Sequence, residues 1–226
     1  VHRWLGVVLC LFMAAWFASG AVLIYVPFPS LSTTEQMNRA GWVDASRIRF
    51  TPQEVVQRTG IPSPIDHLRL IERGDRPLYV VQVRGQPAAA FWADDGSPAR
   101  LQSTAEAIAI ASRFAAAGIE RVDEPIDFDQ WVVHQGFDLK RPYFRAHVAD
   151  QARTVLYVSQ STGEVLQRTT RSQRAWNYVG AVVHWIYPTV LRRHWAAWDQ
   201  VVWWLALSGI VLVIVGEILG VHHVLQ

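Results

Sequence analysis

The sequence predicts a membrane-anchored α+β protein, in which two transmembrane helices flank two tandem modules that each combine a helix with a small antiparallel sheet. Three observations support this fold class. Long apolar runs lie near both ends of the 226-residue chain, the charged residues (18%) gather between these runs, and the middle alternates short helical patterns with strand patterns. A hydrocarbon core about 30 Å thick needs about 20 helical residues, and each terminal run reaches that length.

The first apolar run carries no charged residue from Trp4 to Thr34 and predicts a transmembrane helix over residues 1–28. A cleaved signal peptide has a shorter apolar stretch and small residues at its cleavage site. This run ends in the bulky sequence YVPFP, so we expect the helix to be retained.

The second apolar run ends at Val221 and is followed at once by His222 and His223. It predicts a transmembrane helix over residues 199–223. If both helices cross a bilayer and the polar middle stays on one side, the helices are antiparallel. In that arrangement His2 lies on the same side as His222 and His223. Histidines that face each other across two membrane helices are typical of a b-type haem site.

The polar middle predicts a first module over residues 46–101. Its helix begins after Thr51, with Pro52 at the first helical position and Glu54 in the first turn, and it ends near Gly60. Strand patterns separated by Gly-Asp and Asp-Gly turns follow at residues 67–72, 78–84 and 88–93.

A second module over residues 102–170 repeats this order. Ser103 and Glu106 predict a capping box at the start of an alanine-rich helix over residues 105–117, which Gly118 closes. Two helix-then-sheet modules about 50 residues apart indicate a duplication. The strand patterns of the second module lie at residues 128–134, 143–148, 154–159 and 164–168.

Residues 175–191 form a third uncharged stretch, which is short for a membrane span and contains Pro188. It predicts an interfacial or short membrane helix that precedes the last span. Tryptophan and tyrosine are enriched where a membrane meets water. Six such residues follow one another here: Trp176, Tyr178, Trp185, Tyr187, Trp195 and Trp198.

Several short motifs occur in a fixed order: HRWLG opens the first apolar run, YVPFP ends it, DDGSP and STGEV form turns in the two modules, and AVVHWIYP precedes the last run. Together they resemble the PepSY-associated transmembrane family over nearly the whole chain. The resemblance implies a bacterial inner-membrane protein with a periplasmic PepSY region. Some members are similar to ferric-siderophore reductases that carry two bis-histidine haems. Longer members have further membrane helices after the point at which this chain stops, so the resemblance implies an N-terminal portion.

The boundary histidines predict one or two non-covalent haem b groups, because Cys10 is the single cysteine and no C-x-x-C-H site is present. On a helix, His2 shares a face with Gly6 and Gly20, where a missing side chain would admit a flat macrocycle. His223 likewise shares a face with Gly209, Gly216 and Gly220, whereas His222 points toward Val215, Ile218 and Leu219. Helical geometry therefore favours His2 and His223 as the axial ligands of haem iron, with His222 as the other candidate.

The alternative interpretation is that Gly216 and Gly220 form a helix-packing seam and that the terminal histidines lie among lipid headgroups. The second candidate ligand is His184, which follows Gly180 at the same spacing of four that relates His2 to Gly6. Its partner would be His194 or a residue on a further helix. A boundary histidine in an aromatic belt is the competing interpretation.

The other histidines, His67, His134 and His147, fall on separate predicted strands with no ligand-like spacing, and we interpret them as ordinary sheet residues. Glu217 is the only carboxylate in an apolar run. A carboxylate inside a membrane span predicts a functional role, in which Glu217 pairs with Arg3, contacts a partner of a haem propionate or relays a proton. The alternative is that its side chain only snorkels to the nearby interface.

The arginines oppose the periplasmic placement. Only Arg3 marks the side of the chain termini, and five arginines flank the polar domain: Arg168, Arg171, Arg174, Arg192 and Arg193. The positive-inside rule would place this domain in the cytoplasm. Because long domains follow the rule poorly, we keep the periplasmic placement that the resemblance implies.

The leading functional prediction is a haem-bearing electron carrier of the inner membrane, which takes electrons from an unknown cytoplasmic or membrane donor and could reduce a ferric siderophore outside. No G-x-G-x-x-G follows a strand, and no hydrolase motif or basic nucleic-acid-binding stripe is present in the sequence. The alternative is a membrane-anchored PepSY interaction module that regulates a peptidase or another envelope partner.

Overall fold

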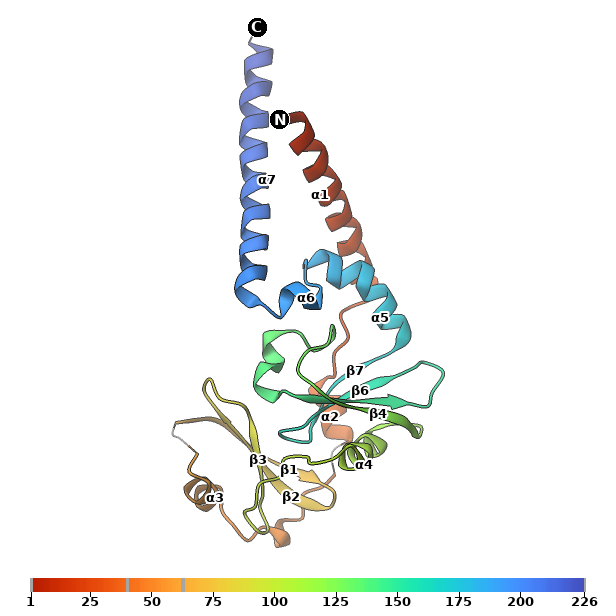
Figure 1. Cartoon of the computed structure of the whole chain (residues 1–226), viewed down its shortest axis with the longest axis vertical. Coiled ribbons are helices and arrows are strands. Elements are labelled where there is room, and N and C mark those ends of the chain that lie inside the picture. Colours follow the sequence, from red (N-terminus) through yellow and green to blue (C-terminus); the bar gives the residue numbers. More distant parts are fainter. Residues whose placement is uncertain (1, 40, 62–63, 226) are drawn as a thin grey trace. The chain divides into compact units, whose positions relative to one another are not determined.

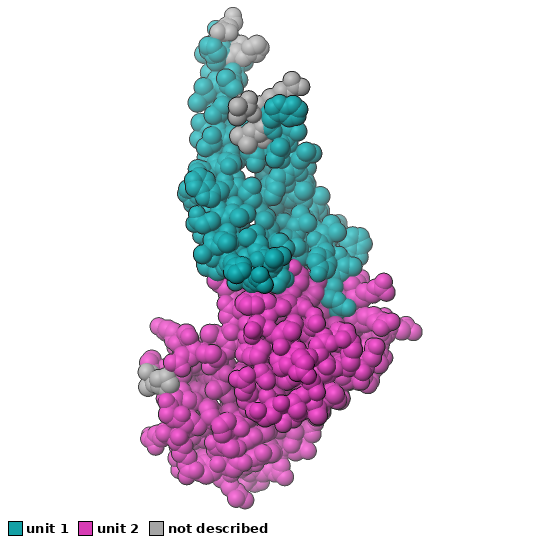
Figure 2. Space-filling model, viewed as in Figure 1, with its two compact units in different colours: residues 1–28, 173–226 teal, residues 29–172 magenta. Residues whose placement is uncertain are grey.

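The structure is a computed structural model that describes residues 2–39, 41–61 and 64–225. It forms two compact units, coloured separately in Figure 2. Unit 1 comprises Val1–Phe28 and Gln173–Gln226, and unit 2 comprises Pro29–Ser172. Six side chains in the described ranges are left out of the description: His2, Arg3, Leu5, Thr33, Met37 and His223.

Unit 1 contains two long helices, α1 (His2–Tyr25) and α7 (Trp195–Val224), which contact each other. They run antiparallel, and both chain ends lie at the same end of the pair (Figure 1). Both helices are long and apolar enough to span a membrane. Most of their described apolar side chains are exposed, which is the pattern of a helix that faces lipid. The two predicted long apolar helices are thus present, and α1 ends at Tyr25 because Pro27 disfavours helix at the residue before it.

The segment that directly precedes α7 is broken into several short helices, where the sequence predicted one helix over 175–191. It consists of α5 (Arg171–Asn177), the π-helix η3 (Tyr178–Val182), which is continuous with it, and α6 (Thr189–Arg192). The break has a local cause, because Pro188 precedes the first residue of α6 and Ile186 adopts a left-handed conformation with φ 53°.

Unit 2 begins with α2 (Thr33–Arg39) and the short 3-10 helix η1 (Ala45–Arg47), which the sequence did not predict. The helix α3 (Pro52–Thr59) begins after Thr51 and ends at Gly60, as predicted. In addition, Thr51 and Glu54 form a reciprocal capping box, and Gly60 takes φ 66°. The first sheet has the order β1-β2-β3, all antiparallel, with bounds β1 (Ile65–Arg73), β2 (Arg76–Val83) and β3 (Ala89–Trp92). Its core beneath α3 consists of Val55, Tyr79, Val81, Phe91 and Ala93.

The second sheet has the order β4-β5-β6-β7 and is also antiparallel. The helix α4 (Thr104–Phe114) packs on one face of it, where Ala107, Ala111 and Phe114 meet alternate residues of the strands. The 3-10 helix η2 (Gln135–Lys140) precedes the second strand. The strands are β4 (Ile119–Ile126), β5 (Tyr143–Val148), β6 (Val155–Ser159) and β7 (Val165–Thr169).

Three local predictions for this module are wrong. Residues 128–134 are a loop, and the strand is β4, which was missed because it is an edge strand with charged residues and Pro125. His134 is therefore not a sheet residue, and its Nδ1 instead accepts a hydrogen bond from the Gly136 N–H at the start of η2. At α4, only half of the predicted capping box forms: Ser103 accepts from the Glu106 N–H, but the Glu106 carboxylate accepts from the Gln102 N–H and not from the Ser103 N–H. The helix also ends at Phe114, before the predicted Ala117.

The two sheets of unit 2 are joined to each other. Arg69 forms an ion pair with Glu164 at 2.7 Å, and the Leu101 N–H donates to the Gln160 carbonyl at 2.9 Å. The residues before position 46 also belong to this unit, since the buried Gln167 amide donates to the Pro29 carbonyl at 2.7 Å. The helix-then-sheet order is thus present twice, but the two predicted modules form one compact unit with residues 29–45.

Candidate functional site

His184 lies against α1 within unit 1, and its surroundings are the most specific arrangement around any predicted ligand. Its ring stacks on the indole of Trp16, with centroids 4.8 Å apart and planes 6° from parallel. Trp16 Nε1 donates to the His184 carbonyl at 3.0 Å. A Cβ built on Gly20 would lie 2.9 Å from His184 Cε1, so this position of α1 must be a glycine for the ring to fit. Gly20, predicted to face His2, is therefore covered by His184.

Hydrogen bonding fixes the tautomer of His184. Nδ1 lies 3.0 Å from the Trp16 carbonyl oxygen, which can only accept, so Nδ1 carries the hydrogen. The buried Ser19 hydroxyl donates to the same carbonyl at 2.8 Å and lies 3.3 Å from Nδ1. In the neutral ring Nε2 then holds the lone pair, and it makes no hydrogen bond within the described part of the chain. An Nδ1–H bond to a backbone carbonyl is the usual way that a protein prepares Nε2 for a metal.

The backbone that carries His184 is irregular and buttressed. The π-helix η3 lies directly before it, and such insertions are frequent at functional sites. Gly180, on this turn, brings the backbone against Val22 and Leu23 of α1, where an added Cβ would lie 3.1 Å from Val22. Asn177 is fully buried and donates to the carbonyls of Pro27 (3.2 Å) and Gln173 (3.0 Å), whereas its Oδ1 is buried with no partner.

Backbone strain occurs two residues after His184. Ile186 has φ 53°, which is a genuine outlier for a β-branched residue. Residues held in such conformations cost about 1–3 kcal/mol and cluster at functional sites. The backbone around His184 is therefore irregular on both sides, with the π-helix directly before it and the strained isoleucine two residues after it.

The other predicted ligands are placed less definitely. The Nε2 atom of His194 accepts a hydrogen bond from Arg193 Nε at 3.1 Å, so this histidine already has a protein partner at that nitrogen. His222 is exposed in the last turn of α7, and the side chains of His2 and His223 lie outside the described residues. Gly6, Gly209, Gly216 and Gly220 each have open space where a Cβ would be built, so the described residues do not use Gly216 and Gly220 as a packing seam. Glu217 is exposed on α7.

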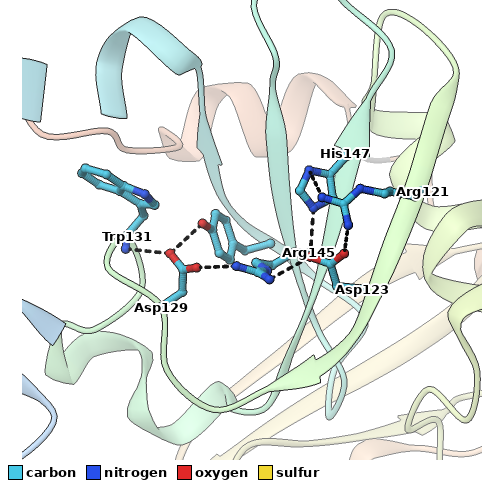
Figure 3. Close-up of polar contacts among 7 residues, drawn as sticks. Arg121, Asp123, Asp129, Trp131, Arg145 and His147 are labelled. Carbon is cyan, nitrogen blue, oxygen red and sulfur yellow. Dashed lines mark hydrogen bonds and ion pairs between the residues drawn. The ribbon is translucent and has the colours of Figure 1, made fainter. Parts of the chain in front are cut away.

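A second polar cluster, on the face of the second sheet opposite α4, was not predicted (Figure 3). Arg145 bridges two carboxylates, with Nη1 2.9 Å from Asp129 and Nη2 2.8 Å from Asp123. Asp123 also contacts His147 Nε2 at 2.9 Å and Arg121 Nη1 at 2.5 Å. Asp129 accepts from the Tyr157 hydroxyl at 2.9 Å and from the Trp131 N–H at 3.2 Å.

The charges of this cluster compensate one another. Burial alone would raise the pKa of Asp123, but the hydrogen bond from His147 and the charges of His147, Arg145 and Arg121 outweigh burial and hold this pKa below its ordinary value. Burial likewise opposes the charge of Arg145, yet the hydrogen bond and charge of Asp129, with Asp123, raise its pKa. All four carboxylate oxygens are engaged, so the cluster fastens the loop that contains Asp129 to the sheet.

Sequence reasoning could have found part of both sites. On β5 the apolar residues Phe144, Ala146 and Val148 alternate with Arg145 and His147, and this period of two predicts that the latter pair share a face. Asp129 lay in the misassigned strand and gave no such signal. Trp16 and Ser19 were missed because a packing partner on a distant segment leaves no trace in the local pattern.

Among the described residues no group of three or more histidine, cysteine or carboxylate side chains is placed to hold a metal ion. Comparisons with protein-family models, with curated proteins and with solved structures each found no match. The resemblance to the PepSY-associated transmembrane family therefore stays a prediction. The donor set around His184 nevertheless fits one axial bond to haem iron, because a neutral imidazole with a fixed Nδ1–H and an unpartnered Nε2 is the ligand such a bond needs.

Proposed function

We propose that this protein is a membrane-anchored haem b protein that transfers electrons, with His184 as one axial ligand. The proposal is carried by one observation: the Nδ1 of His184 is bonded to the Trp16 carbonyl, while Nε2 has no partner in the described part of the chain. A histidine that served only as an interfacial polar group would not require a π-helix, a strained isoleucine and a glycine cradle to hold its ring.

The bound haem would supply a one-electron iron couple, and two axial imidazoles favour electron transfer over oxygen binding because no coordination position stays open. The residues of the chain orient the ligand. Trp16 stacks on the imidazole and Ser19 supports the carbonyl that holds Nδ1–H. Hydrogen bonding at Nδ1 raises the basicity of the ligating nitrogen, so these two residues would tune the iron potential.

His2 and His223, or His222 in its place, are proposed to hold a second haem at the other end of the same helices. Support comes from the antiparallel arrangement of α1 and α7 and from the open faces at Gly6, Gly216 and Gly220. The second ligand of the His184 haem is proposed to come from a helix outside this chain or from His194 after it releases Arg193.

The proposed setting is the bacterial inner membrane, with unit 2 as a PepSY-like region in the periplasm. Two helices long and apolar enough to span a membrane support the anchoring, and two successive helix-plus-antiparallel-sheet elements support the PepSY-like assignment. A cytoplasmic or membrane partner would supply electrons, and a ferric chelate such as a siderophore is the proposed acceptor.

The test is the dithionite-reduced minus oxidised absorption spectrum of the intact chain, purified in detergent after expression with added haem. We expect a sharp α band, and we expect His184→Ala to lose about one haem equivalent in a pyridine haemochrome assay. His67→Ala, in β1 of unit 2, is the matched control and should keep the full haem content. His2→Ala and His223→Ala report separately on the second haem.

The role of each residue is tested by imidazole rescue and by the midpoint potential, in addition to haem content. His184→Ala should regain the α band when imidazole is added, because the small ligand replaces the missing axial bond. Ser19→Ala should keep the haem and shift its midpoint potential. A colourless wild-type chain would refute the redox proposal.

The second candidate is an interaction module without redox activity, and one feature favours it. The strand β1 is an edge of the first sheet, it is nine residues long, and much of it is exposed. An exposed edge can add an extended peptide as a further strand. A colourless protein that binds an envelope peptidase through β1 would establish this function.

A further inference from the structure

Exposed aromatic side chains occur in unit 1 along the segment that leads from α5 to the start of α7. Figure 1 shows the course of this segment. Trp176 is 53% exposed, Tyr178 54%, Trp185 40% and Trp195 45%. Tryptophan and tyrosine are suited to the headgroup level of a membrane, because each ring joins an apolar body to a polar N–H or O–H.

The same segment has one sign of charge. Residues 173–198 contain three arginines and no aspartate or glutamate. Arg193 is exposed, and its Nε donates to His194 at 3.1 Å. Its Nη1 and Nη2 atoms make no hydrogen bond or ion pair within the described ranges, so a planar fork of donors faces outward. Arg174, on α5, is half-buried and adds a second guanidinium. Such forks match the geometry of phosphate oxygens.

The structure also reduces the conflict with the positive-inside rule. Of the five arginines that flank the polar domain, Arg168 forms an ion pair with Glu35 at 2.8 Å. Arg192 is buried, with its guanidinium 4.5 Å from the ring centroids of both Trp195 and Trp198. The charges of Arg168 and Arg192 are thus engaged within the protein. Arg193 is exposed among the aromatic residues, where it would meet lipid phosphate.

We propose that this interfacial surface (Arg174, Trp176, Tyr178, Trp185, Arg193 and Trp195) binds the headgroups of anionic phospholipids. Its charge is complementary to them, and it is continuous with two helices that are long and apolar enough to cross the bilayer. The inference rests on the membrane anchoring proposed above and is independent of haem. An arginine close to an anionic lipid surface strengthens binding by roughly fivefold.

The test compares two lipids on the intact chain in detergent by native mass spectrometry, with dioleoyl-phosphatidylglycerol and dioleoyl-phosphatidylcholine titrated separately. We expect the anionic lipid to bind at least fivefold more tightly, and the ratio to fall as the ionic strength rises. In the double variant Arg174→Gln/Arg193→Gln the ratio should fall close to one. The control Arg84→Gln/Arg153→Gln removes two exposed arginines of unit 2 and should leave the ratio unchanged.

Arg193→Gln alone provides a second variant, because its side chain is exposed and its loss leaves the fold intact; it should lower the ratio by roughly fivefold. Equal binding of both lipids by the wild-type chain would overturn the proposal. A double variant that keeps the lipid preference would also overturn it. The same holds if the chain forms a dimer in lipid nanodiscs that covers this surface and binds both lipids equally. Haem content is measured in the same samples, so failure of the haem proposal and failure of this one are distinguishable.

Discussion

At the scale of single residues, Asp129 determines how one loop is attached to the second sheet of unit 2. Its carboxylate accepts from Tyr157, from Arg145 and from the Trp131 N–H. Asp129→Asn removes the charge that faces Arg145 and one acceptor, and we expect it to lower the free energy of unfolding by about 1–3 kcal/mol. Asp127→Asn, in the same loop and exposed, should change it by less than about 0.5 kcal/mol. Thermal unfolding followed by circular dichroism compares the two, and equal losses would contradict the role of Asp129.

Asp123 gives the same cluster a defined dependence on pH. Its pKa is lowered from an ordinary value of 3.8, so its ion pairs stabilise the fold fully above that value. This contribution is lost as the pH falls through the lower, folded-state pKa. We expect the unfolding temperature to drop below about pH 4, and Asp123→Asn to have a shallower drop in that range. Glu124→Gln removes an exposed carboxylate at the next position and is the control. An unchanged slope in Asp123→Asn would show that this carboxylate has no such role.

At the scale of elements, the contact between α1 and the turn that carries His184 depends on Gly20. A Cβ there would lie 2.9 Å from the imidazole, so Gly20→Ala should destabilise the haem-free chain in detergent by about 1–3 kcal/mol. The double variant Gly20→Ala/His184→Ala should recover most of this loss, because the ring that clashes is gone. Gly6→Ala meets open space and should cost nothing. The cycle compares the thermal unfolding of the wild type, Gly20→Ala, His184→Ala and the double variant. Strictly additive losses of stability would contradict this contact.

Elements with a strong local signal were predictable, and elements defined by distant partners were not. Both ends of α3 were predicted correctly, because Thr51, Pro52, Glu54 and Gly60 carry the local signals of a helix start and a helix end. The loop around Trp131 reads as a strand because its apolar residues are buried against a polar sheet face, which a local pattern cannot reveal. The π-helix η3 is also defined by a distant partner, since its Gly180 packs against Val22 and Leu23 of α1. The break that follows at Ile186 and Pro188 has a local cause.

At the scale of the whole molecule, the division into two units separates two kinds of stability. Unit 2 has apolar cores of its own on both sheets. Unit 1 leaves most of its described apolar side chains exposed, and its two long helices are apolar enough to span a membrane. The candidate redox site, at His184, belongs to unit 1 and the Asp129 cluster belongs to unit 2. Variants of the Asp129 cluster should therefore alter the unfolding of unit 2 without changing haem content.

The division also predicts that residues 29–172 fold without the membrane helices. We expect this fragment to be soluble and to unfold in one cooperative thermal transition, because the two sheets share ion pairs and backbone hydrogen bonds. A shorter fragment, residues 46–172, lacks the Pro29 carbonyl that accepts from Gln167, the apolar packing of Leu31 and the Glu35 carboxylate that pairs with Arg168. Its free energy of unfolding should be lower by about 2–4 kcal/mol, which corresponds to a midpoint lower by about 5–15 °C. Equal midpoints would mean that residues 29–45 are only a linker, and two fragments without a cooperative transition would mean that unit 2 depends on unit 1.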